Sequence, residues 1–371
     1  MKVFDVVGFD NGYDYVKLVL GKGKGHRVRF PSVTYKQEND FSIFNIDNIS
    51  GTAKFKKNKM SLTVDGEKYY IGEYAVEQDA MGGEKNFSEK KFQAKSELAK
   101  LLAGVSVFTI EDEIVINNLV LGLNVDKYPE YKQEIVNAFK NKSFEYKLSN
   151  KDVHNKLTIK NVICVPQGIG AYYDQILDMK GRPSQNELAN SRFGLIDIGG
   201  KTVDAFISQG TEPIIGTDIG TDFGMADAFK QVAKDLELDI PYNLISRNYI
   251  KGKNKVFWRG EDRNFKGLVK KSFEEFANRI HKLITNEWDQ QLARIRNILL
   301  CGGGANFLGT YLPDMFEVDV KLLENAQFSN TSGYYKLGAY SVRKKRAAKK
   351  AKQKAKQEKN NKDKEDEKEQ K

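Results

Sequence analysis

Short apolar runs that end at or near glycine recur along the chain. Each holds several large or β-branched apolar residues in succession, without the strict polar alternation of a half-exposed strand. The runs occupy residues 3–12, 113–124, 161–170, 194–200 and 297–305. Strands of this kind are typical of a central sheet that is covered by helices on both faces.

Segments with apolar residues three or four positions apart separate these runs and predict amphipathic helices. Between residues 60 and 75 the pattern instead indicates antiparallel strands, and Asp65–Gly66 predicts a hairpin turn there. Helices placed between buried strands predict an α/β fold. The helical segments are 93–103, 128–140, 171–179, 224–235 and 270–296.

Composition predicts a globular protein with room for two domains. The chain has 371 residues, of which 40% are hydrophobic and 30% are charged. No apolar run approaches the roughly 20 residues that span a bilayer, so we expect no membrane-spanning segment and a cytoplasmic location. Cys164 and Cys301 lie in apolar runs, which predicts buried thiols and not a disulfide framework.

The net charge of +10 is concentrated at the end of the chain. Residues 343–371 hold 14 Lys and Arg and 6 Asp and Glu, whereas residues 1–342 hold 46 and 44 and are nearly neutral. We expect this charged tail to be largely disordered, although its first half is suited to continue a helix for a few turns. A solubilising tail and an electrostatic arm for DNA, a partner or an anionic surface both remain open.

A strand, an Asp-X-Gly turn and a second strand occur twice in the sequence. The first turn contains Asp10 and Gly12, and the second contains Asp197 and Gly199. Glycine turns let backbone N–H groups converge on an anion such as the phosphates of a nucleotide. Carboxylates would repel phosphates, so we expect the two aspartates to hold a hard cation, most simply Mg²⁺, largely through its waters.

A third glycine element follows the buried strand near residue 300. Gly302, Gly303 and Gly304 would let a flat ligand face, such as a base and its sugar, lie against the backbone. Taken alone, each of these glycine turns is more simply a tight turn. Their order in the chain, each after a buried strand, favours a nucleotide site.

These elements resemble the actin fold that actins, the large chaperone ATPases and the sugar kinases share. The resemblance covers roughly residues 1–342 and is closest to the plasmid-segregating bacterial actins, the ParM-like group. It rests on two phosphate loops, an adenosine motif and two connecting elements: "DNGYDYVK" (10–17), "IDIGGKTVD" (196–204), "LCGGGA" (300–305), "VPQGIGAYY" (165–173) and "NTSGYYKLGAY" (330–340).

The resemblance implies an α/β, actin-like fold of two similar domains, each a central mixed sheet flanked by helices, with the nucleotide in the cleft between them. Domain I would span residues 1–165, with a small antiparallel-rich subdomain near 30–95, and domain II would span 166–342. The implied protein hydrolyses ATP or GTP with Mg²⁺ and forms polar cytoskeletal filaments. It would drive plasmid DNA partition through a DNA-binding adaptor on a plasmid centromere.

The resemblance also implies a role for single residues of this chain. Asp10 and Asp197 would organise Mg²⁺, Gln167 would orient the attacking water, and Lys17 would neutralise the β-phosphate. The other implied contacts are Gly12, Tyr13, Gly199, Gly200 and Lys201 around the phosphates, Thr202 and Asp204 supporting the second loop, and Gly302, Gly303 and Gly304 along the base and ribose.

Three of these positions have a second interpretation, and Asp14 beside them departs from the pattern of the family. Asp14 adds an acid to the first loop, so we expect it to point away from the phosphates or to bind the cation. Lys201 either contacts the phosphates or faces solvent. Gln167 alternatively caps the helix that follows it, and Lys17 alternatively is a solvated strand residue.

Other functions are compatible with the same fold. A small-molecule kinase of the sugar type needs a general base for the acceptor hydroxyl, for which Asp204 is the candidate. A scaffold that binds nucleotide without hydrolysis is a third hypothesis. A chaperone ATPase is disfavoured, because we find no β-rich substrate domain after residue 342.

Overall fold

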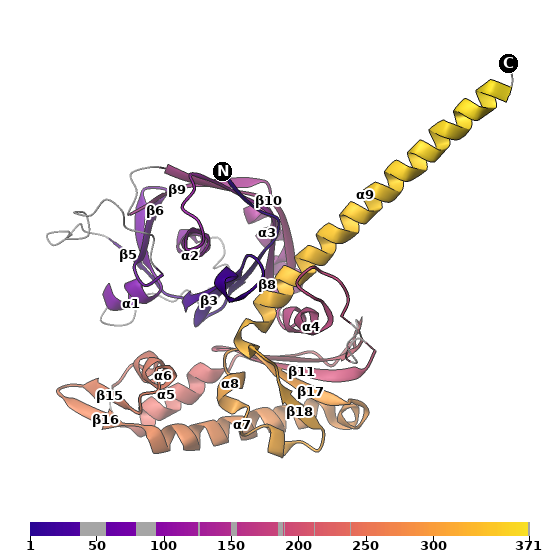
Figure 1. The fold of residues 1–371 in the computed structure, drawn as a ribbon. Coiled ribbons are helices and arrows are strands. Elements are labelled where there is room, and N and C mark those ends of the chain that lie inside the picture. Colours follow the sequence, from indigo (N-terminus) through magenta and orange to yellow (C-terminus); the bar gives the residue numbers. More distant parts are fainter. Residues whose placement is uncertain are drawn as a thin grey trace.

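Two sheets, each with helices packed on it, make up the body of the protein (Figure 1). The structure is a computed structural model, and it describes residues 1–37, 57–78, 94–124, 127–149, 154–184, 188, 190–210, 212–237 and 239–369. Among these residues the first sheet has ten strands and the second has six, and a separate two-stranded ribbon joins β15 (Lys255–Trp258) to β16 (Glu261–Asn264). The predicted two-domain α/β fold is confirmed.

The first sheet is mixed, with the order β4-β3-β2-β8-β10-β9-β6-β7-β5 and with β1 also paired to β8. The long strand β8 runs parallel to β1, β2 and β10, and the remaining pairs are antiparallel. Its strands are β1 (Lys2–Phe4), β2 (Val7–Asn11), β3 (Tyr15–Val19), β4 (Arg27–Pro31), β5 (Thr34–Lys36), β6 (Met60–Val64), β7 (Glu67–Ile71), β8 (Glu113–Leu123), β9 (Lys142–Leu148) and β10 (His154–Pro166).

The second sheet repeats the arrangement of a hairpin beside a parallel strand. Its order is β13-β12-β11-β17-β18, with β14 paired to β12. The pairs β11–β17 and β17–β18 are parallel, and β11–β12 is an antiparallel hairpin, as β2–β3 is in the first sheet. Its strands are β11 (Arg192–Ile198), β12 (Val203–Gln209), β13 (Glu212–Pro213), β14 (Ile219–Gly220), β17 (Asn297–Cys301) and β18 (Asp319–Leu322).

The helices enclose a separate apolar core in each half. In Figure 1 the strands of the first sheet curve around α2, whose Ala99, Leu101 and Leu102 are fully buried. The largest cluster of buried apolar side chains lies in the second half and includes Trp288. The helices are α1 (Glu73–Gln78), α2 (Lys95–Ser106), α3 (Tyr128–Phe139), α4 (Ile169–Ile176), α5 (Met225–Asp235), α6 (Tyr242–Ile250), α7 (Lys266–Trp288), α8 (Ala305–Leu308) and α9 (Ser329–Glu369).

Several local predictions are confirmed. The five buried runs contain or overlap β2, β8, β10, β11 and β17, and the five helical segments contain or overlap α2, α3, α4, α5 and α7. Asp65 and Gly66 both have positive φ and join β6 to β7, as the hairpin prediction required. Of the predicted subdomain near 30–95, residues 38–56 and 79–93 lie outside the described residues, and the domain boundaries themselves stay a prediction.

The tail differs from its prediction. We expected residues 343–371 to be largely disordered, but α9 continues as one helix to Glu369. Ala, Lys, Gln and Glu, which dominate this segment, all have high helix propensity, and the helix is already nucleated in the body, where Thr331 and Tyr334 are fully buried. In the described part of the chain no helix is long and apolar enough to cross a membrane.

Candidate functional site: two glycine hairpins at one cavity

The first hairpin places a buried acid against a lysine. In the β2–β3 register Asp10 lies opposite Lys17, and Lys17 Nζ is 2.7 Å from Asp10 Oδ2. The Lys17 side chain is only 12% exposed, so the alternative of a solvated strand residue is wrong. A Cβ on Gly12 would lie 2.8 Å from the Tyr15 carbonyl oxygen, so the tight turn requires glycine.

The second hairpin has the same backbone arrangement as the first, but an acid and not a lysine lies opposite its aspartate. In the β11–β12 register Asp197 lies opposite Asp204, and Thr202 Oγ1 donates a 3.0 Å hydrogen bond to Asp204 Oδ2. A Cβ on Gly199 would lie 2.9 Å from the Thr202 carbonyl oxygen, which matches the crowding at Gly12. The Gly199 amide donates to that same oxygen at 2.9 Å, so it closes the turn and is not directed at a ligand.

Asp197 is the acid whose protonation the site changes most clearly. Burial raises the pKa of its carboxyl to about 6, against the opposing effects of the Asn330 hydrogen bond and the Lys17 charge, while Asp10 raises it further. The Asn330 side-chain amide donates to Asp197 Oδ2 and accepts a 3.0 Å hydrogen bond from the Ala171 amide through its carbonyl oxygen. Asn330 therefore ties α9 and α4 to the second turn.

A buried ion pair on α2 holds the first turn in place through hydrogen bonds. Lys100 and Glu97 of α2 pair at 2.8 Å, and Asn11 Nδ2 donates to Glu97 at 2.7 Å. Lys100 also donates to Ser32 Oγ at 3.1 Å, and the Ser32 amide donates to the Asp14 carbonyl oxygen at 2.8 Å. Both sides of the turn are thus bonded, directly or through one residue, to this pair.

The three glycines after β17 do different jobs. Gly302 has φ +88°, and its amide donates to Ala326, while the Gly304 amide donates to Ile198. A Cβ on Gly304 would lie 2.4 Å from Ile198 and Met225, so this residue allows close packing. A Cβ on Gly303 would meet only the Gln327 amide nitrogen, at 3.7 Å, so Gly303 is the glycine that faces open space.

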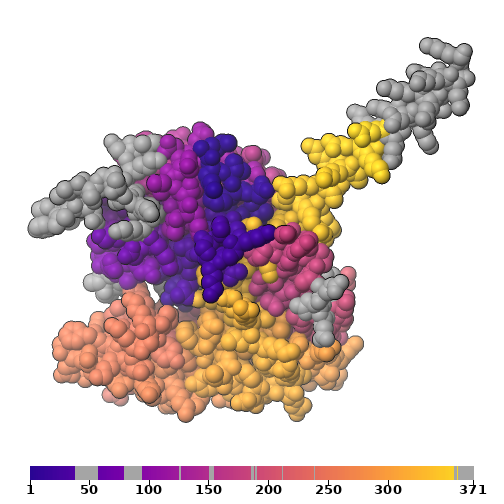
Figure 2. Space-filling model, in the orientation of Figure 1, coloured from indigo at the N-terminus to yellow at the C-terminus, as the bar shows by residue number. Residues whose placement is uncertain are grey.

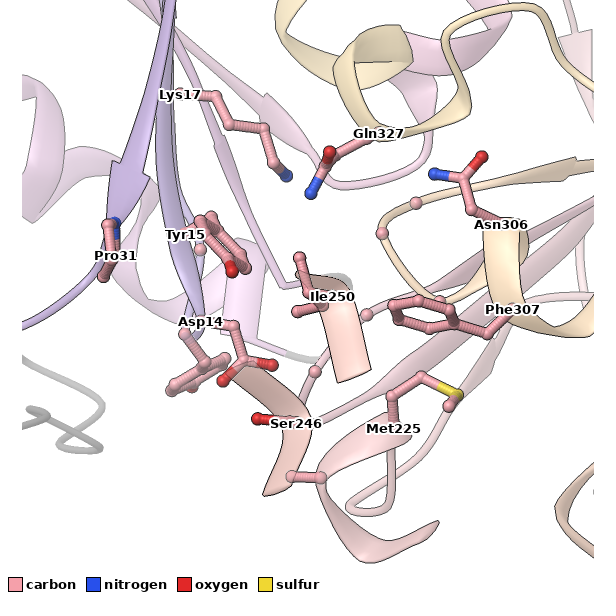
Figure 3. Close-up of a pocket in the computed structure, with 18 of the residues that line it drawn as sticks. Asp14, Tyr15, Lys17, Pro31, Met225, Ser246, Ile250, Asn306, Phe307 and Gln327 are labelled. Atoms are coloured by element: carbon pink, nitrogen blue, oxygen red, sulfur yellow. The ribbon is translucent and has the colours of Figure 1, made fainter. Parts of the chain in front are cut away.

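These elements converge on one cavity of about 290 Å³ (Figure 3). Figure 3 shows Lys17, Gln327 and Asn306 projecting toward it, with Ile250 and Phe307 further along the wall. Nearly all of the predicted site residues line this cavity: Asp10, Gly12, Tyr13, Lys17, Gln167, Asp197, Gly199, Gly200, Thr202, Asp204, Gly302, Gly303 and Gly304.

Lys201 is the predicted residue that does not line this cavity. Its Nζ lies 4.7 Å from the centre of the Tyr13 ring, a cation–π contact between the two turns. It borders a second cavity of about 610 Å³, which Tyr13, Gln167 and Thr202 also line. Lys201 therefore lies against a ring, and neither of its two predicted placements describes that contact.

The structure also bears on the predictions for Asp14 and Gln167. Asp14 lines the cavity, and its carboxylate packs so closely on Gly200 that a Cβ there would lie 1.8 Å from Asp14 Oδ2. Gly200 leaves space for this carboxylate, and the prediction that Asp14 points away from the phosphates or binds the cation stays a prediction. The N-cap of α4 is Gly168, and no side chain caps that helix, so the capping alternative for Gln167 is wrong.

Sequence reasoning missed several other side chains that line the cavity. Arg29 of β4 lies with its guanidinium 4.7 Å from the Tyr15 ring and hydrogen-bonds the Gln327 side chain. Burial lowers the pKa of the Arg247 guanidinium on α6, which also lines the cavity. An apolar section of the wall comes from α5, α6 and α8: Met225, Phe229, Tyr249, Ile250 and Phe307. These residues belong to no short motif, and only the pairing of β4 with β3, opposite Lys17, could have indicated Arg29.

Comparison with known proteins gives the same assignment for both halves. A family model described as "Actin like proteins N terminal domain" matches residues 8–170, and one described as "Archaeal actin homologue MreB-like, C-terminal" matches residues 195–314. An archaeal actin homologue from Thermoplasma volcanium is 25% identical over 187 residues, which is 47% of this chain and 54% of the relative. The match thus spans about half the length of that curated relative.

Solved structures show the fold. The archaeal actin homologue Ta0583 in complex with ADP superposes with a TM-score of 0.70 at 21% identity, over 90% of this chain and 98% of that chain. A subunit of a 15-stranded ParM filament from Clostridium botulinum superposes with a TM-score of 0.72 at 20% identity, over 91% and 99%. These superpositions show the actin-like fold. Family models of actin homologues match consecutive parts of the chain, residues 8–170 and 195–314, and the chain belongs to the actin-like proteins.

Proposed function

We propose that this protein is a Mg²⁺-dependent hydrolase of ATP or GTP whose activity is coupled to assembly into a polar filament. In the proposal the filament moves plasmid DNA in the cytoplasm, through a DNA-binding adaptor on the plasmid centromere. One observation carries the proposal: two matching glycine hairpins bring Asp10 and Asp197 to the same cavity. The ADP complex of a relative with the same fold supports nucleotide as the ligand.

The cavity has a polar end and an apolar end, as a nucleotide requires. Lys17 and Arg29 supply positive charge beside the two turns. The apolar side chains of α5, α6 and α8, with open space at Gly303, suit a base and its sugar. We therefore place the phosphates between the hairpins and the nucleoside against Gly303.

The acids fit a magnesium ion that is held mainly by waters and phosphates. No group of three or more His, Cys, Asp or Glu in the described ranges forms a complete protein cage for a metal. Mg²⁺ usually takes only one or two carboxylates together with substrate phosphates, and Asp10 and Asp197 supply that number. When bound, the ion would neutralise charge on the phosphates during transfer.

Gln167 is the residue we propose to orient the attacking water. It follows β10 directly, and its backbone amide donates to the Leu123 carbonyl oxygen at 2.7 Å, which fixes the main chain at this position. Gln167 lines both cavities. An amide can accept a hydrogen bond from a water and also donate one, as the positioning of a nucleophile requires.

Two parts of the proposal have separate support. Proteins with the same fold support filament assembly, and the charge of the body supports an adaptor. A ParM filament subunit shares the fold, and a polar filament needs a head-to-tail interface that does not close into a ring. Residues 1–342 hold 46 basic and 44 acidic residues. A body so close to neutral has little electrostatic attraction for DNA, which is why the proposal includes an adaptor.

Phosphate release and light scattering, recorded together after addition of Mg-ATP or Mg-GTP, test this function. We expect scattering to rise and phosphate to be released, and Asp197→Asn to slow phosphate release by roughly 100-fold or more, the scale on which loss of one charge-stabilising group acts. Asp314→Asn, at an exposed carboxylate, is the matched control and should behave as wild type.

Each alternative has its own signature in the same assay. Phosphate release without scattering would contradict the filament proposal. Nucleoside diphosphate that forms only with a sugar acceptor present, without free phosphate, would support the kinase, because a kinase transfers the phosphoryl group to the acceptor hydroxyl. A negligible rate that Gln167→Ala leaves unchanged would instead support the scaffold that binds nucleotide without hydrolysis.

A further inference from the structure

The part of α9 beyond the body is the most strongly charged surface of the described chain. We call residues 343–354 the basic arm. All twelve of its residues are exposed, and it contains no Asp or Glu. Its eight basic residues are Arg343, Lys344, Lys345, Arg346, Lys349, Lys350, Lys352 and Lys354.

The basic arm is the continuation of a helix that is anchored in the body. Thr331 and Tyr334 are fully buried, and Tyr334 packs with Val6 and Val120 of the first half. Figures 1 and 2 show α9 leaving the body and projecting away from it. An ion pair of 3.1 Å between Arg346 and Asp5 lies where the helix leaves. The arm therefore presents its charge on a helix of fixed direction.

The charges surround this helix and do not form a stripe. At 100° per residue, the eight basic positions fall on every side of the helix axis. The only other residues in the arm are Ala347, Ala348, Ala351 and Gln353. A helix that binds a membrane surface needs an apolar face, and the basic arm has none, so a lipid surface is a poor fit.

A groove of double-stranded DNA matches this distribution. The two strands place phosphates on both sides of a helix that enters the major groove, which is about 12 Å wide and admits an α-helix. The twelve residues of the arm make a helix of about 18 Å, over which duplex DNA carries about ten phosphates. We propose that the basic arm binds double-stranded DNA through its phosphates, without sequence preference, as a helix seated in a groove.

Fluorescence anisotropy of a labelled 24-base-pair duplex of arbitrary sequence, titrated with the full chain, tests this. Nucleotide is omitted, so the result does not depend on hydrolysis or assembly. Each contacted phosphate contributes about 0.9 to the slope of log K against log salt. With four or more contacts we expect affinity to fall at least 100-fold between 50 and 200 mM NaCl. A salt-independent affinity, or none at 50 mM, would overturn the proposal.

Two matched quadruple variants separate the basic arm from net charge. Replacing Lys349, Lys350, Lys352 and Lys354 by Gln should lower the slope by about three to four, with an unchanged melting temperature as evidence of folding. Replacing four exposed lysines of the body by Gln removes the same charge and should leave DNA affinity within threefold: Lys22, Lys24, Lys253 and Lys255. Equal losses in both variants would contradict a role for the arm.

Two further measurements test whether the basic arm binds as a helix in a DNA groove. Ala351→Pro keeps every charge but interrupts the helix, and we expect it to weaken duplex binding roughly tenfold; unchanged binding would overturn the seated helix. Vesicles with 30% phosphatidylserine at 150 mM NaCl should not bind the protein. Binding to these vesicles in the absence of duplex binding would assign the basic arm to a membrane instead.

Discussion

The two hairpins at the cavity share a backbone and differ in the charge opposite their aspartate. In the first, Lys17 lies across from Asp10 and pairs with it at 2.7 Å. In the second, another acid, Asp204, lies across from Asp197. The chain therefore neutralises the first carboxylate itself, while the second accepts hydrogen bonds from the Asn330 amide and the Cys301 thiol and lies farther from the charge of Lys17.

This difference indicates where a cation contributes most. Burial alone raises the pKa of a carboxyl, because the charged form loses its hydration, and Asp197 shows that effect with a pKa of about 6. A divalent ion on the second hairpin would supply the charge that Lys17 supplies on the first. The carboxylate of the first turn is thus neutralised within the folded chain, whereas a bound cation would neutralise that of the second.

Removing the lysine should have the largest effect on the folded protein. Lys17→Met leaves Asp10, 4% exposed, without its partner, and breaking a buried pair costs about 3 kcal/mol of the free energy of unfolding. Urea denaturation without nucleotide measures this. Lys17→Met/Asp10→Asn should recover most of the loss.

The equivalent substitution in the second hairpin should cost little stability. Asp204→Asn keeps an acceptor for Thr202 and removes a like charge opposite Asp197, so it should change the free energy of unfolding by less than about 1 kcal/mol or increase it. An Asp204→Asn loss as large as that of Lys17→Met would show that the two turns do not differ in this way.

The pH dependence of stability should show the second hairpin directly. The pKa of Asp197 is raised from 3.8 to about 6, so between these values the folded state binds more protons than the unfolded state. The free energy of unfolding contributed by Asp197 therefore falls as the pH rises through this window, by about 2 kcal/mol. The difference between wild type and Asp197→Asn, measured by urea denaturation from pH 4 to pH 7 without Mg²⁺, isolates this contribution. A difference that does not vary with pH would contradict the raised pKa.

The glycines after β17 should show a modest effect, on nucleotide affinity at one position and on stability at the other. Gly303→Ala places a methyl group in open space, so we expect the melting temperature to be unchanged and nucleotide affinity to fall about fivefold, or about 1 kcal/mol. Gly304→Ala meets Ile198 and Met225 at 2.4 Å and should instead destabilise the fold. Thermal melts and nucleotide titrations of both variants make the comparison, and equal behaviour would argue against a nucleoside at Gly303.

Local sequence was enough to predict the hairpins and not their surroundings. The Asp-X-Gly turns, the glycines after β17 and most helices are contiguous patterns whose geometry follows from a few neighbouring residues. Asn330 and Arg29 reach the cavity from segments far away in the chain, and Lys201 bonds to a ring on the other turn. Such contacts depend on how the two halves pack, which no local pattern contains.

For the charged tail, the prediction from composition was wrong. Its lack of large apolar residues argued for disorder, since such a segment buries too little to offset its ordering entropy. Its helix propensity and its attachment to the buried start of α9 argue for a helix. Composition alone does not weigh these two effects, because the anchoring residues Thr331 and Tyr334 lie outside the tail.

The most direct test of the difference between the hairpins is the effect of Mg²⁺ on ADP affinity in wild type, Asp197→Asn and Asp314→Asn at pH 7.5. Isothermal titration with and without Mg²⁺ gives the ratio of the two affinities for each protein. We predict that Mg²⁺ strengthens binding at least tenfold in wild type and Asp314→Asn, and less than twofold in Asp197→Asn. An equal strengthening in Asp197→Asn would contradict the assignment of the cation to the second hairpin.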